Sequence, residues 1–234
     1  MGCAAQRPKL NDEEETLVEQ ERKLKYSELL AVRVDQVFRK HSYDGIVNAA
    51  QFGAAVTDLK LGITNEGPHS RIAAFYEGLN RGGVYKLNQL LLTGLLLSAG
   101  SPATKAELLY EIYDKDCTDS VTPANVRDIL ADLLEIAIVR LHDLVGTNQN
   151  GPADPTAVRY YIDKLLINRK SIDDKLIAAI VQGKTQVTKA EFVRVFGSEE
   201  LKHLLTSSGF RLYYYKEYQK KATSFQAPAK TAKA

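Results

Sequence analysis

Apolar residues recur along most of this chain at the three- and four-residue spacing of amphipathic helices, and the alternating pattern of strands is nearly absent. Asn11, with an acid three positions later at Glu14, is typical of a helix start. The pattern then predicts one long N-terminal helix, whose core-facing stripe contains Tyr26, Leu30, Val34, Val37 and Phe38.

Further helix starts follow along the chain. Thr188 and Glu191 have the spacing of a capping box, and residues 146–155 have the Gly, Pro, Asn and Asp content of a connector. A capping residue stands before a proline, which suits the first helical position, at Ser101-Pro102, Thr122-Pro123 and Asp154-Pro155. The sequence therefore predicts an all-α fold.

Four short strings repeat within this pattern, each after an apolar helix. Each begins with a valine and has a carboxamide or carboxylate four positions later, and the valines are Val47, Val84, Val121 and Val187. The first three valines are 37 residues apart, and the fourth follows after 66 because the 146–155 connector intervenes. A helix, a loop with one β-branched residue and a second helix is the layout of an EF-hand.

Between about Val34 and Phe196 the chain therefore resembles the EF-hand superfamily, and in its arrangement the calcineurin-B and neuronal-calcium-sensor branch. The resemblance implies four helix–loop–helix units in two paired lobes, a groove for a partner's amphipathic helix, and no catalysis. The expected segments are an N-terminal segment 1–10, a first lobe 11–97, a second lobe 98–210 and an aromatic, basic tail 211–234.

Calcium requires six or more oxygen ligands, which an EF-hand loop supplies from fixed positions. The first, second and fourth loops place lysine, arginine or apolar residues at several of these positions. The third loop keeps oxygens, but Asp119 replaces the usual glycine and an amide replaces the bidentate glutamate. We expect no cofactor other than weakly bound calcium in this loop, with the candidate ligands Asp114, Asp116, Thr118, Ser120, Thr122 and Asn125.

Composition excludes several classes of protein. The 234 residues hold 31 Lys and Arg against 29 Asp and Glu, so we expect no nucleic-acid partner that depends on phosphate neutralisation. Two cysteines and four histidines lack the spacing of a zinc site, and phosphate-loop, nucleophile-elbow and HExxH motifs are absent. We therefore expect a protein without enzymatic activity.

The two ends of the chain carry candidate membrane signals. Gly2 suits N-myristoylation and Cys3 palmitoylation, although Gln6 stands where the motif favours Ser or Thr, and an ordinary Met-Gly start is the alternative. Five lysines against one glutamate in 216–234 predict a flexible basic tail, which either contacts an anionic surface or is merely solvated. With no secretory signal, the expected location is the cytoplasm, including the cytoplasmic face of a membrane.

Two apolar segments are candidates for partner binding. Leu91 and Leu95 lie in a leucine-rich helix that forms either a groove wall or, the reading we favour, a helix buried on all sides. Tyr213, Tyr214 and Tyr215 either contact a partner or dock back onto the body.

The function predicted from the sequence is a non-catalytic adaptor or regulatory subunit that binds a protein partner largely without calcium. A calcium sensor that acts through the third loop is the alternative. A structural component of a cytoskeletal or membrane complex is a further one.

Overall fold

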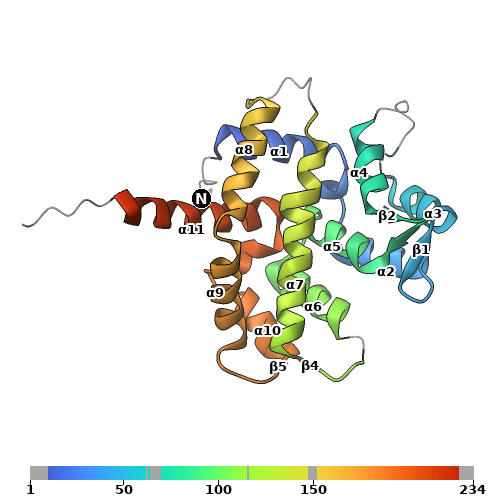
Figure 1. The fold of residues 1–234 in the computed structure, drawn as a ribbon. Helices are drawn as coiled ribbons and strands as arrows, with labels where there is room; N and C mark the ends of the chain where they lie inside the picture. The colour runs from blue at the N-terminus through green and yellow to red at the C-terminus, as the bar shows by residue number, and fades with distance from the viewer. Residues whose placement is uncertain (1–9, 62, 64–69, 115, 147–151, 227–234) are drawn as a thin grey trace, which may run out of the picture.

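The structure is a computed structural model that describes residues 10–61, 63, 70–114, 116–146 and 152–226. It is mostly helical with a few very short strands, which confirms the all-α prediction at that level (Figure 1). The elements in chain order are α1 (Asp12–Arg22), η1 (Tyr26–Glu28), α2 (Ala31–Lys40), β1 (Ile46–Asn48), α3 (Ala49–Leu59), α4 (Arg71–Leu79), β2 (Asn80–Arg81), β3 (Val84–Lys86), α5 (Leu87–Leu97), α6 (Pro102–Tyr113), β4 (Ser120–Val121), α7 (Pro123–Leu134), η2 (Glu135–Arg140), η3 (Leu141–Leu144), α8 (Pro155–Leu166), α9 (Arg169–Val181), β5 (Val187–Thr188), α10 (Lys189–Phe196), η4 (Lys202–Leu205) and α11 (Ser207–Gln226).

The prediction of one long N-terminal helix is wrong. Asn11 does cap α1, with its Oδ1 accepting a hydrogen bond from the Glu14 backbone N–H at 2.9 Å. The helix then ends at Arg22, and Lys25 takes a left-handed conformation with φ 64°. This break turns the chain so that Tyr26 is buried against Tyr76, with the two hydroxyls 3.0 Å apart.

The first half of the chain forms two helix–loop–helix units, α2–β1–α3 and α4–β2/β3–α5. Their loops meet in a three-stranded antiparallel sheet of order β1-β3-β2, in which Val47 lies opposite Tyr85. Helix α2 packs closely on α5 because Gly94 has no side chain: a Cβ there would lie 2.3 Å from Val34 Cγ1.

The second half repeats this arrangement with α6–β4–α7 and α9–β5–α10. Strands β4 and β5 pair antiparallel, with Val121 opposite Val187. Helix α7 continues through the π-helical η2 and the 3₁₀ turn η3 as one rod, and α8 is inserted before α9 (Figure 1). The predicted caps at Ser101, Thr122 and Asp154 are all present.

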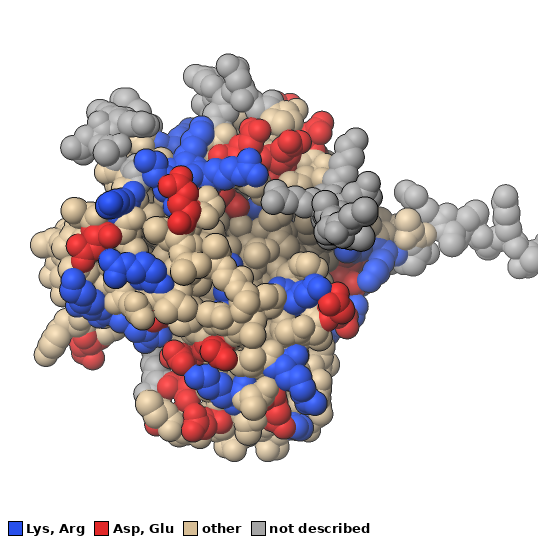
Figure 2. All heavy atoms as spheres, turned by 180° about the vertical axis from the view of Figure 1, so that it is seen from behind, with Lys and Arg blue, Asp and Glu red and all other residues tan. Residues whose placement is uncertain are grey.

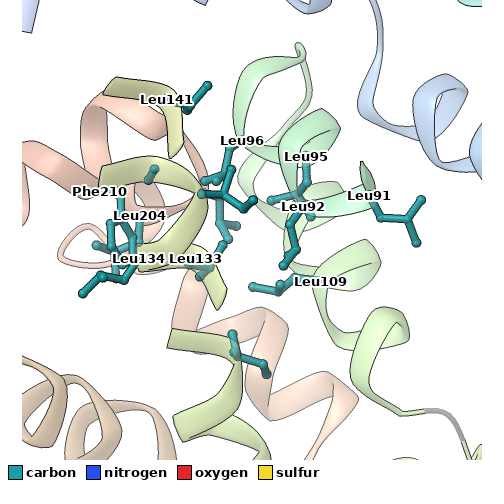
Figure 3. Packing of buried hydrophobic residues seen from close by; sticks show 14 of the residues in the cluster. Leu91, Leu92, Leu95, Leu96, Leu109, Leu133, Leu134, Leu141, Leu204 and Phe210 are labelled. Carbon is teal, nitrogen blue, oxygen red and sulfur yellow. The ribbon is translucent and has the colours of Figure 1, made fainter. Parts of the chain in front are cut away.

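Helix α5 lies in the core. Leu91 and Leu95 are each only 3% exposed, so the buried interpretation of this helix is correct and neither leucine is available to a partner in this structure. In Figure 3, Leu92 of α5 lies near Leu109 of α6, and Leu134 of α7 lies near Leu204 and Phe210. Such packing removes apolar surface from water, and each Å² removed stabilises the folded state by roughly 25 cal/mol.

The predicted flexible tail is instead helical through residue 226. Helix α11 begins inside the body, where Phe210, Arg211 and Tyr214 are fully buried, and its far half projects from the body (Figure 1). This outcome agrees with the alternative that the aromatic run docks back onto the body. Residues 227–234 of that predicted tail lie outside the described residues.

Candidate functional site

The paired loops are the candidate site. The repeat of valines predicts that Val84 corresponds to Val47, but the residue opposite Val47 is Tyr85, one position later. Gly82 and Gly83, both with positive φ, form the turn between β2 and β3. Val121 and Val187 pair as the valine alignment expects.

Asp114 organises the third loop from within. Its Oδ1 accepts hydrogen bonds from the Thr118 N–H at 2.9 Å and the Thr118 hydroxyl at 3.2 Å, and its Oδ2 accepts one from the Asp119 N–H at 3.1 Å. Asp119 itself has φ 52°, so the aspartate adopts the left-handed turn that glycine normally supplies. The loop therefore keeps its turn, and hydrogen-bond donors of Thr118 and Asp119 surround the carboxylate of Asp114.

The other predicted ligands are only partly gathered. Asn125 Oδ1 accepts hydrogen bonds from the Thr122 backbone N–H at 2.9 Å and from its hydroxyl at 2.7 Å, which closes a capping box on α7. Asp116 is exposed, and the Ser120 carbonyl accepts from the Thr118 hydroxyl at 3.3 Å. Within the described residues, no group of three or more His, Cys, Asp or Glu is arranged to hold a metal.

These contacts make the third loop a poor fit to calcium. The ion needs six to eight oxygens, usually including a bidentate carboxylate. Here Asn125 stands at the position of the bidentate carboxylate, and its single amide oxygen already accepts two hydrogen bonds from Thr122. Burial raises the pKa of the neighbouring Tyr110 to about 12, and the negative charges of Asp114 and Asp119 contribute to this increase.

In the fourth loop a lysine provides the positive charge. Lys184 forms an ion pair with Glu191 Oε1, while Glu191 Oε2 accepts a hydrogen bond from the Thr188 N–H at 3.1 Å. The hydrogen bond from Lys184, and then those from Thr188, lower the pKa of Glu191 to about 2. The predicted capping box of Thr188 and Glu191 is confirmed, and Lys184 is the charge partner of its carboxylate.

A lysine also forms an ion pair beside the first loop. Lys40, the last residue of α2, pairs with Asp58 of α3 at 3.2 Å. His41 Nε2 lies 2.9 Å from the same Asp58 carboxylate oxygen. Hydrogen bonds from His41 and then Lys40 lower the pKa of Asp58.

A cleft of about 540 Å³ lies between the first and third loops. Its described lining includes the positive charge of Lys86, the negative charges of Asp44 and Asp114, and the exposed thiol of Cys117. Histidine is not among these lining residues, so no imidazole base stands beside the thiol there.

The three predicted partner-binding tyrosines pack within the molecule. The Tyr214 ring is buried and its hydroxyl donates to Asp173. Tyr215 is half-buried, with its ring centroid 5.2 Å from that of Tyr161. Tyr213 is also half-buried and lies edge-on to Tyr214. The lipidation candidates Gly2 and Cys3 lie outside the described residues.

A buried charge cluster that sequence reasoning missed joins the first and last helices. Arg211 donates to Glu14 through Nη2 at 2.7 Å, and through Nη1 to Glu21 at 2.6 Å and the Ala137 carbonyl at 2.8 Å. We call Arg211, Glu14 and Glu21 the terminal clasp. The Tyr161 hydroxyl donates to Glu14 at 3.0 Å, so α8 also joins the clasp.

Burial and charge act in opposite directions within the terminal clasp. Arg211 and Glu14 are fully buried and Glu21 is 7% exposed. Burial raises the pKa of Glu21, although the Arg211 charge acts in the opposite direction. A sequence signal did exist, since Glu14 and Glu21 are seven residues apart and therefore share one face of α1.

Figure 2 shows lysines, arginines and acids interspersed over one face of the molecule, as the near-neutral net charge suggests. Across the part of the chain that the structure describes, no helix combines the length and the apolar content needed to cross a membrane. A scan against protein-family models gives no match, and a search of curated proteins finds no significantly similar sequence.

Proposed function

We propose that this protein is a non-catalytic adaptor or regulatory subunit of the EF-hand type, which binds an amphipathic helix of a protein partner largely independently of calcium. The observation that carries the proposal is the pairing of helix–loop–helix units through their loops, with protein groups in place of a bound cation. Strand β1 pairs with β3, and β4 pairs with β5.

The loop chemistry supports a fixed shape rather than a calcium switch. Lys184 neutralises Glu191 in the fourth loop, and backbone N–H groups surround Asp114 in the third. Because these groups already satisfy the carboxylates, binding an ion would first require breaking protein contacts. A ligand shifts an equilibrium only by its differential affinity for the two states, so we expect calcium to produce little change.

Thermal unfolding in EGTA and in 1 mM calcium tests this proposal. A site with Kd near 1 mM adds only about 0.4 kcal/mol, whereas a sensor site with Kd near 1 μM adds about 4 kcal/mol. For a chain of this size, these values correspond to Tm increases of roughly 1 °C and 8–16 °C. The proposal predicts the small increase, and it also predicts that the tagged full chain recovers the same complexes from cells in both buffers.

The alternative, a calcium sensor acting through the third loop, is favoured by one observation: Asp119 keeps the left-handed turn that this loop type requires. A Tm increase of 8 °C or more that Asp114→Ala abolishes would establish the alternative. A structural role in a cytoskeletal or membrane complex is supported only if deleting 222–234 releases the protein from that complex.

Acylation at Gly2 and Cys3, and a location on the cytoplasmic face of a membrane, form part of the same proposal. One myristoyl chain gives only marginal, reversible binding, so a second signal is needed. Mass spectrometry of the native N-terminus tests the modification directly, and an unmodified glycine would remove this part of the proposal.

A further inference from the structure

The outer half of α11, residues 216–226, carries an excess of positive charge. Its charged residues are Lys216, Lys220 and Lys221 against Glu217. Glu217 accepts hydrogen bonds from Lys220 at 2.6 Å and from Lys175 of α9 at 3.1 Å. The one acid of this segment therefore has two lysine partners already, and the segment presents a cationic surface where α11 projects from the body (Figure 1).

Aromatic rings lie beside these lysines. Tyr215 and Tyr218 are half-buried and stacked, with centroids 6.4 Å apart and planes 19° apart. Tyrosine combines an apolar ring with a polar tip, which suits the interfacial region of a bilayer. Lysines beside tyrosines match the chemistry of an anionic lipid surface, where cations meet headgroups and rings lie at headgroup depth.

The terminal clasp places the start of the described chain next to the root of α11. Glu14, in the first turn of α1, is bonded to Arg211 of α11 and to Tyr161 of α8. Eight residue steps separate Gly2 from Leu10, so chain length alone keeps Gly2 within about 30 Å of Leu10. The outer half of α11 is itself roughly 16 Å long.

We infer that the outer half of α11 is a docking surface for a bilayer containing anionic phospholipid, and that it supplies the second signal a single acyl chain requires. This inference rests on the membrane association included in the proposed function. An acidic peptide is the competing occupant, and the experiment distinguishes the two.

The test is co-sedimentation of the unmodified full chain with vesicles of phosphatidylcholine, with and without about 30% phosphatidylserine. Each lysine near the surface strengthens binding about fivefold, so the variant Lys216→Gln, Lys220→Gln, Lys221→Gln should lose on the order of 100-fold in partitioning. The matched control is Lys23→Gln, Lys60→Gln, Lys86→Gln, which makes the same charge change at exposed lysines outside α11. Circular dichroism checks that both variants remain folded.

The inference predicts binding to the phosphatidylserine vesicles only, weakening at 0.5 M salt, with the control retaining it within about twofold. Absence of binding by the unchanged protein overturns it, as does an equal loss in the two variants. Binding of a polyglutamate peptide as strong as that of the vesicles would reassign the surface to an acidic protein. None of these results alters the calcium response, so failure here leaves the adaptor proposal standing.

Discussion

Replacing Arg211 with methionine should destabilise the protein severely. The guanidinium is fully buried and contacts both Glu14 and Glu21, and methionine keeps much of its aliphatic volume but none of its charge. Removing one partner of a buried ion pair costs about 3–5 kcal/mol because the remaining charge is left uncompensated. In this chain that loss corresponds to a Tm decrease of roughly 6–20 °C.

Urea denaturation of Arg211→Met and of Arg194→Met, an exposed control on α10, measures this effect. The control should change the free energy of unfolding by less than about 0.5 kcal/mol. In Arg211→Met the Arg211 charge no longer opposes the effect of burial on Glu21, so the pKa of Glu21 rises further. Protonation of Glu21 then favours the folded state, and the deficit should shrink from pH 8 to pH 5.

Neutralising the two acids provides the decisive comparison. Glu14→Gln and Glu21→Gln, added to Arg211→Met, remove the buried charges while keeping groups that can accept hydrogen bonds from Tyr161 and Ser207. The triple variant should therefore be more stable than Arg211→Met alone. The reasoning is refuted if Arg211→Met costs less than about 1 kcal/mol, or if the triple variant recovers nothing.

Three further predictions follow from other parts of the structure. Gly94→Ala should lower the free energy of unfolding, measured by urea denaturation, by about 1–3 kcal/mol because the new Cβ would clash with Val34. Adding Val34→Ala should recover part of that loss. An unchanged denaturation midpoint in Gly94→Ala would contradict the close packing of α2 on α5. Burial lowers the pKa of Lys105 to about 8, so below that pH the folded state carries an unfavourable buried charge. The free energy of unfolding should therefore rise by about 1.5 kcal/mol between pH 8 and pH 9.5. A Lys105→Met variant with the same rise would contradict this assignment. Asp114→Ala should lower stability in EGTA by about 1–3 kcal/mol because the Thr118 and Asp119 N–H groups lose their acceptor; a loss seen only with calcium present would instead indicate a metal ligand.

Helix starts could be predicted because they depend on local chemistry. Asn11, Thr122 and Thr188 each accept a backbone N–H within three residues, and that spacing is visible in the sequence. The break at Lys25 could not be predicted in the same way. A lysine rarely adopts φ 64°, and here the turn accompanies the burial of Tyr26 against Tyr76, fifty residues away.

Long-range pairing explains the other differences. The aromatic run around Arg211 leaves partner contact and docking onto the body equally open in the sequence, and its burial depends on acids about 190 residues earlier in the chain. In the second loop Tyr85, not Val84, lies opposite Val47, because pairing register depends on both strands and the recurrence of valine does not fix it. The weak calcium binding expected from the identities of the loop residues stays a prediction.

The most direct test of the account is NMR measurement of the contacts between paired loops in calcium-free buffer. In EGTA, backbone nuclear Overhauser effects should connect Val121 with Val187 and Val47 with Tyr85, and 5 mM calcium should leave the amide shifts of both pairs nearly unchanged. Absence of these contacts until calcium is added would contradict the claim that protein groups alone hold the loops together.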